Sequence, residues 1–146
     1  MIAPYGDTHF MKLALAEAEK AFTQDEVPVG AVIVAKNQVI ARAYNLTEKL
    51  NDVTAHAEMQ AITAAADFLG GKYLRGCTLY VTVEPCVMCG GALYWSQLDR
   101  VVFGTADEKR GAGTKGNLYH PKTKVEGGIM EKECAALMKQ FFQKKR

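Results

Sequence analysis

Two short polar motifs constrain this chain most strongly: His56-Ala57-Glu58, and Pro85-Cys86-Val87-Met88-Cys89 about thirty residues later. Cys86 and Cys89 are three residues apart, so on a helix their thiols lie on one face, one turn apart. With the His56 imidazole they make a set of two sulfur ligands and one nitrogen ligand, which suits zinc. Three protein ligands leave one position for water, as in catalytic sites. The fold must therefore bring two distant segments together.

Glu58 is the candidate catalytic residue. It follows His56 by two positions, so on a helix the two side chains point in different directions and are not expected to share the metal. At the first turn of a helix, its carboxylate can still reach a water on the metal, whose pKa zinc lowers to about 7. One carboxylate would then accept a proton and pass it to the substrate. A redox dithiol is the competing interpretation of the cysteines, but it gives the His56 and Glu58 pair no role.

The composition indicates one globular domain over residues 1–146. Apolar residues make up 49% of the chain and charged residues 23%, and the net charge is +2. A chain of this length forms a single core without covalent staples. The small net charge neither requires nor excludes a nucleic-acid partner. The four cysteines, with no signal peptide and no apolar run of about 20 residues, favour reduced thiols, the cytoplasm and no membrane partner.

The hydrophobic pattern predicts alternating helices and strands. Helices are expected over 7–24, capped by Asp7 or Thr8, from a Thr54 N-cap to Gly70, from Pro85 in the first turn to Trp95, and over 129–142. Strands are expected over 27–34, 39–44, 78–83 and 100–104, with a weaker signal over 123–126. A strand followed by a helix, twice, favours a parallel pair covered by helices. His56 and Cys86 then fall at helix N-termini.

The combined motifs resemble the signature of the cytidine deaminase-like superfamily of zinc-dependent nucleobase deaminases. Within it, the chain most resembles the bacterial tRNA-specific adenosine deaminases, over nearly its whole length from Phe10 to Arg146. The superfamily as a whole shares the zinc motif. The stretches that point to the tRNA enzymes are 26–32, 111–113, 133–137 and the Phe141-Phe142 pair with the basic end that follows it.

The resemblance implies an α/β fold, a three-layer α/β/α sandwich around a five-stranded mixed sheet. It also implies a homodimer that acts on a tRNA anticodon stem-loop, where an activated water attacks C6 of the wobble adenosine and inosine forms. One zinc ion (Zn2+) per chain would be bound by His56, Cys86 and Cys89, with Glu58 as the proton carrier. The implied substrate-binding residues are Asn45, Ala57, Val29 and Glu84. The implied RNA contacts are Lys109, Arg110, Phe142, Lys144, Lys145 and Arg146.

Departures from the pattern keep other functions open. Ala106 stands where many relatives carry arginine, segment 114–120 is shorter than is typical, and Tyr94-Trp95 is similar to an aromatic pair in guanine deaminases. The first alternative is therefore a deaminase of a free base or nucleoside, such as guanine or cytosine. The second is a non-catalytic, zinc-stabilised RNA-binding subunit, against which the intact Glu58 counts. Asn45 also has a structural alternative, as a loop residue that bonds its own backbone. The basic residues could likewise be ordinary solvated charges.

Overall fold

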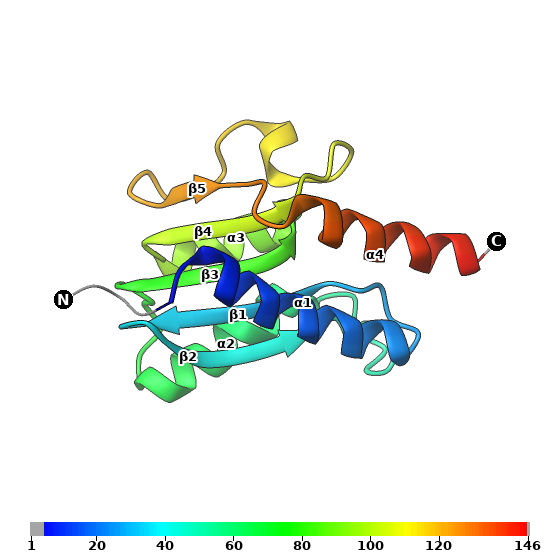
Figure 1. Cartoon of the computed structure of the whole chain (residues 1–146). Coiled ribbons are helices and arrows are strands. Elements are labelled where there is room, and N and C mark those ends of the chain that lie inside the picture. The colour runs from blue at the N-terminus through cyan, green and yellow to red at the C-terminus, as the bar shows by residue number, and fades with distance from the viewer. Residues whose placement is uncertain (1–4, 146) are drawn as a thin grey trace.

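The apolar runs at 30–35 and 77–83 form the central strands of a five-stranded sheet in the computed structural model, which describes residues 5–145 (Figure 1). The sheet order is β2-β1-β3-β4-β5. β1 pairs antiparallel with β2 and β3, whereas β3, β4 and β5 run parallel. The elements are α1 (Asp7–Thr23), β1 (Gly30–Ala35), β2 (Gln38–Tyr44), α2 (Ala57–Leu69), β3 (Cys77–Val83), α3 (Val87–Ser96), β4 (Arg100–Thr105), the 3₁₀ turn η1 (Ala112–Lys115), β5 (Lys124–Glu126) and α4 (Glu131–Lys144).

Helices cover both faces of the sheet, with α1 and α4 on one side and α2 and α3 on the other (Figure 1). Successive strand residues point to opposite faces. Ala31 and Ile33 therefore pack in the core under α2, while Val32 and Val34 pack in the core under α1. The predicted three-layer α/β/α sandwich with a mixed sheet is confirmed. Across residues 5–145, none of the helices has the length and hydropathy that a bilayer crossing requires.

The fifth strand is present where the weak signal placed it. β5 is three residues long and exposed throughout, and it pairs only with β4 along the described chain. A short edge strand buries neither face, so its sequence lacks the apolar alternation of the other strands.

The structure differs from the prediction at the start of the first strand and at the N-cap of the first helix. The first strand begins at Gly30 rather than Val27, because the Val29 N–H donates to the Val27 carbonyl at 2.8 Å and turns the chain there. The N-cap of α1 is Gly6, so neither Asp7 nor Thr8 caps that helix. The Asp7 side chain instead reaches across the sheet.

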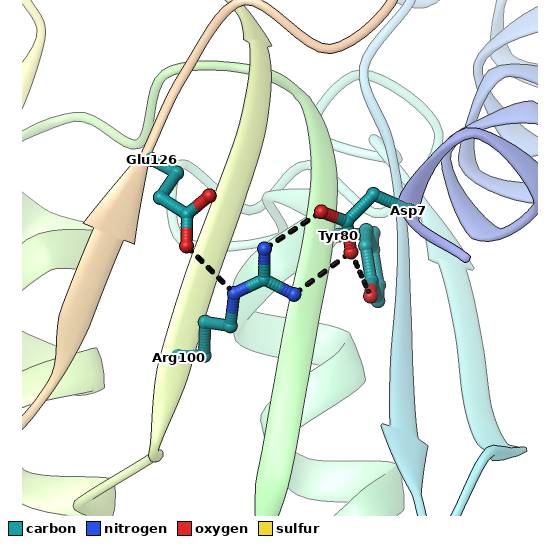
Figure 2. A network of polar contacts seen from close by, with 4 residues as sticks. All are labelled: Asp7, Tyr80, Arg100 and Glu126. Atoms are coloured by element: carbon teal, nitrogen blue, oxygen red, sulfur yellow. Dashed lines mark hydrogen bonds and ion pairs between the residues drawn. The ribbon is translucent and has the colours of Figure 1, made fainter. Parts of the chain in front are cut away.

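A polar network joins α1 to three neighbouring strands (Figure 2). The Arg100 guanidinium on β4 donates two hydrogen bonds to the Asp7 carboxylate, at 2.8 and 2.6 Å, and a third to Glu126 on β5 at 2.9 Å. The Tyr80 hydroxyl on β3 donates to Asp7 at 2.8 Å. Bidentate arginine–carboxylate pairs of this kind are both strong and directional. The hydrogen bonds from Arg100 lower the pKa of Asp7 below its ordinary value of 3.8.

We predict that Asp7→Asn lowers the free energy of unfolding at pH 7 by about 1–2 kcal/mol, because it removes charge-assisted hydrogen bonds that are partly shielded from water. The folded-state pKa of Asp7 lies below the unfolded value, so the carboxylate stabilises the fold fully above pH 3.8 and loses this effect as the pH falls through the lower, folded value. The difference between wild type and variant should shrink below pH 3.8.

Urea unfolding at pH 7 and at a series of acidic pH values measures this difference. Asp67→Asn is the matched control, because Asp67 is exposed on α2. An Asp7→Asn effect that is no larger than the control, or that does not change with pH, would contradict the role given to the network.

Candidate active site and metal centre

The two motifs meet because each lies at the start of a helix. His56 is the N-cap of α2 and Cys86 is the N-cap of α3, and both have extended backbones. Thr54 was predicted to cap α2, but its hydroxyl and N–H both donate to the Asp52 side chain, so the helix starts two residues later. Pro85 was predicted in the first turn of α3 and instead precedes its N-cap. His56 and Cys86 therefore both lie at helix N-termini, as expected. The partial positive charge of a helix N-terminus favours the thiolate form of a cysteine over the thiol.

The ligand atoms have the spacing of a zinc site. His56 Nδ1 lies 3.7 Å from Cys86 Sγ and 3.5 Å from Cys89 Sγ. All three ligand atoms lie within 4.8 Å of one another. Tetrahedral zinc with bonds of about 2.3 Å to sulfur and 2.0–2.1 Å to nitrogen places its ligands about 3.5–3.8 Å apart. The donor set and its geometry therefore fit a zinc ion.

The electrostatics of the cluster also favour a cation. A hydrogen bond from the Cys89 thiol, followed by one from His56, lowers the pKa of Cys86 to about 4. The same bond to the Cys86 thiolate raises the pKa of Cys89. The Cys86 thiolate raises the pKa of His56 as well. The cluster thus holds a thiolate and retains protons on its neighbours, and a metal that takes these ligands displaces the protons.

Glu58 lies on the first turn of α2, within the same cavity as His56 and Cys86. Its side chain is buried, and this burial raises the pKa of Glu58 to about 7. A carboxyl group with a pKa near neutrality can both accept and donate a proton under ordinary conditions. Glu58 therefore has the position and the acidity that proton transfer needs.

The cavity has a volume of about 810 Å³ and is open to solvent. All four residues expected to bind substrate line it: Val29, Asn45, Ala57 and Glu84. Three of the six expected RNA contacts line it too, namely Lys109, Arg110 and Phe142. A cavity of this size is sufficient for a purine base and its ribose.

Comparison with known proteins identifies the relatives of this chain. A family model described as MafB19-like deaminase matches residues 6–146. The tRNA-specific adenosine deaminase of Agrobacterium fabrum is 46% identical over 145 residues, which cover 95% of each chain. The chain belongs to the family of tRNA-specific adenosine deaminases. A protein of this family is an enzyme that catalyses a deamination.

Solved structures place the family within a wider group of deaminases. A structure from a study of A-to-I editing by tRNA:A34 deaminases at the wobble position is 44% identical, with a TM-score of 0.83, and the match covers 89% of this chain and 99% of that one. Guanine deaminase from Bacillus subtilis is 36% identical, with a TM-score of 0.68, and the match covers 77% and 71%. The sandwich is thus common to tRNA and free-base deaminases.

Two further RNA candidates of this deaminase do not line its cavity. Lys144 and Lys145, at the C-terminal end of α4, both pair with the Asp25 carboxylate at the end of α1. The Lys144 ammonium also lies 4.4 Å from the centre of the Phe22 ring. Arg146 lies outside the described residues. The two lysines therefore tie α4 to α1 in this structure, and RNA would have to compete with Asp25 for them.

Sequence reasoning missed several residues that line the cavity. Ala135 and Met138 on α4 are spaced with Phe142 at intervals of three and four residues, so one side of the helix faces the site. This periodicity was visible in the sequence, but it also fits a helix packed on the core. Thr47 and Thr105 line the cavity as well, and nothing in their sequence context marks them.

Glu84 has a structural use in this deaminase. Its two carboxylate oxygens accept hydrogen bonds from the N–H groups of Asp107 and Gly113, each at 3.0 Å. A side chain at Gly111 would overlap the Glu84 carboxyl group. Glu84 therefore lines the cavity and also holds the loop that carries Lys109 and Arg110.

We predict that the protein binds about one zinc ion per chain and that Cys86→Ala weakens zinc binding by more than about 100-fold, because changes outside the first coordination shell already cost 10–100-fold. Metal analysis after dialysis against a chelator measures the zinc content. Cys77→Ala is the control, because Cys77 is a buried thiol outside the cluster. Full deaminase activity without metal would rule out the centre.

We also predict that Gly111→Ala lowers the free energy of unfolding by about 1–3 kcal/mol, because the added methyl group overlaps Glu84 and displaces the loop. Calorimetry measures the change. Gly71→Ala is the matched control, because nothing lies within 4 Å of the position its Cβ would take. Equal melting temperatures for the two variants would contradict the tight fit of the loop around Glu84.

Proposed function

We propose that this protein is a zinc-dependent deaminase that converts adenosine to inosine at the wobble position of a tRNA anticodon. The observation that carries the proposal is the placement of the buried Glu58 carboxyl beside His56 and Cys86 in one open cavity. The choice of substrate is supported by the relatives, which are tRNA-specific adenosine deaminases at up to 46% identity among those compared. We assign the reaction to the cytoplasm, and the whole chain to one domain.

His56, Cys86 and Cys89 would hold the zinc ion. When bound, zinc supplies Lewis acidity that lowers the pKa of a coordinated water to about 7. Glu58 takes a proton from the attacking water and delivers it to N1 of the adenine as the C6–O bond forms. Glu58 then carries the second proton to the C6 amino group, which leaves as ammonia. Water is consumed, the C6 carbonyl of inosine forms, and Glu58 returns to its starting state.

The other cavity residues hold and orient the base. Ala57 is the first residue of α2, so no carbonyl within the helix accepts its N–H, which is therefore free to bond the base. Asn45 offers a side-chain donor and acceptor for the edge of a flipped base, as deaminases of this kind require. Its Oδ1 also receives the Thr47 N–H at 3.4 Å, which limits its rotation.

The mouth of the cavity suits a single-stranded loop. Lys109 and Arg110 supply positive charge for phosphates, and Phe142, which is about half exposed, supplies a ring on which a base can stack. Anticodon loop bases unstack at modest cost compared with duplex bases. These residues support a tRNA anticodon stem-loop as the partner.

We further propose a homodimer. Val87, Gly91, Tyr94 and Trp95 recur at helical spacing on α3, and Trp95 is 73% exposed. Exposed apolar side chains that lie together, here Val87, Tyr94 and Trp95, are typical of a surface that another protein covers. Neither Tyr94 nor Trp95 lines the cavity of this chain. The aromatic pair therefore supports an interface more than it supports recognition of guanine.

We predict inosine formation in an anticodon stem-loop that carries adenosine at the wobble position, and no turnover of free adenosine, guanine, cytosine or cytidine. The loop supplies phosphate and stacking contacts that a free base lacks. Ammonia release and nucleoside analysis measure turnover across this panel. Turnover of a free base with the stem-loop untouched would replace the tRNA function with the first alternative.

We predict that Glu58→Gln lowers kcat by roughly 10²–10⁴-fold, because it removes general acid–base catalysis. Zinc content and stem-loop affinity should stay at wild-type levels. Glu19→Gln, an exposed site on α1, is the control. Wild-type activity in Glu58→Gln would refute the proton-transfer role. If the wild-type protein binds the stem-loop but does not turn it over, the non-catalytic alternative is favoured.

A further inference from the structure

Glu26 is a fully buried carboxylic acid that neither ligates the metal cluster nor lines the catalytic cavity. It follows α1, and its N–H donates to the Ala21 carbonyl at 2.9 Å, which joins it to the last turn of that helix. Its neighbour Val27 lines the cavity. A buried carboxylate costs free energy unless hydrogen bonds compensate, so its partners indicate its use.

Those partners are backbone groups of the loop that follows β2. The Glu48 N–H donates to Oε1 of Glu26 at 3.0 Å, and the Lys49 N–H donates to Oε2 at 2.8 Å. Both oxygens are thus used, and both bonds are charge-assisted. The end of α1 and the end of β2 lie at the same end of the sheet, which brings the two segments together (Figure 1).

The loop that Glu26 holds carries two residues of the catalytic cavity, Asn45 and Thr47. Its other end is fixed by backbone bonds, from Asn45 N–H to the Val29 carbonyl and from Leu46 N–H to the Ala55 carbonyl, each at 3.0 Å. Thr47 lies between these bonds and the two that Glu26 accepts. Bonds within the loop, from Leu50 N–H to the Leu46 carbonyl and from Asp52 N–H to the Thr47 carbonyl, each at 3.0 Å, close its own turns. Release of the Glu26 bonds would therefore detach the loop from the end of α1 and leave Thr47 to move with it.

We propose that Glu26 is a positioning residue for the deamination: it fixes the loop 45–49 so that Asn45 and Thr47 hold the target base in line with Glu58. The inference rests on the proposed function. It differs from a purely structural role because the loop held by Glu26 reaches the cavity. A misplacement of about 1 Å at such a site can lower turnover by about 10²-fold.

The test compares Glu26→Gln with Glu48→Gln. Glu26→Gln keeps the size of the side chain, but its NH2 group cannot accept one of the two N–H bonds. Glu48→Gln makes the same charge change on the loop at an exposed side chain and leaves the Glu48 N–H in place. Turnover of the stem-loop and amide hydrogen exchange are measured on the zinc-loaded proteins, well below their melting temperatures.

We expect Glu26→Gln to lower kcat by about 10–100-fold, with zinc content and stem-loop KM within about threefold of wild type. Amide exchange should accelerate at residues 47–49 and stay unchanged in β1 and β3. Glu48→Gln should match wild type in every measurement. Wild-type kcat in Glu26→Gln would overturn the proposal, and equally accelerated exchange in the central strands would reduce Glu26 to a stability role.

The exchange measurement needs no substrate, so the two proposals fail separately. A wild type that does not act on the stem-loop overturns the proposed function. Unchanged exchange at residues 47–49 in Glu26→Gln overturns the role of Glu26, whatever the substrate is.

Discussion

The convergence of two helix N-termini beside the end of β3 is the constraint on which the site depends. α2 and α3 start at His56 and Cys86, and each N-cap has an extended backbone that lets its side chain face the other helix. The N–H groups at a helix start have no carbonyl partner within the helix, so anionic groups are stabilised there. A thiolate ligand and a negative charge that develops on the substrate both gain from this one arrangement of the backbone.

Three buried or partly buried glutamates around this point have different environments. Glu58 is buried beside the cysteines, and burial makes its carboxyl hold a proton near neutral pH. Glu26 and Glu84 each accept two backbone N–H bonds from loops that line the cavity. The residue type is the same at all three positions. The surroundings of each carboxyl group decide whether it can exchange a proton near neutral pH or instead supports a loop.

The sequence predicted the fold and the centre of the site well, for a physical reason. Apolar runs and glycine breaks are local signals, so they indicated the order of the helices and strands. The matching ligand chemistry of the two motifs indicated that His56, Cys86 and Cys89 lie together, and the structure groups them. Exact helix starts depend on which side chain captures a backbone N–H, and at Thr54 the nearby Asp52 decided the outcome. The roles of Glu26 and Asp25 depend on contacts between distant segments, which spacing does not reveal. The same limit applied to the basic residues, where Lys109 and Lys145 looked alike but lie in different surroundings.

The pairing of Lys144 and Lys145 with Asp25 has a consequence for how RNA affinity responds to salt. A lysine that meets a phosphate normally releases condensed counterions, and this release makes binding steeply dependent on salt. Here the Asp25 carboxylate lies beside both ammonium groups and offsets one of their two positive charges. Phosphates that displace Asp25 exchange one anion for another, so these two lysines contribute less to the salt dependence than their charge suggests.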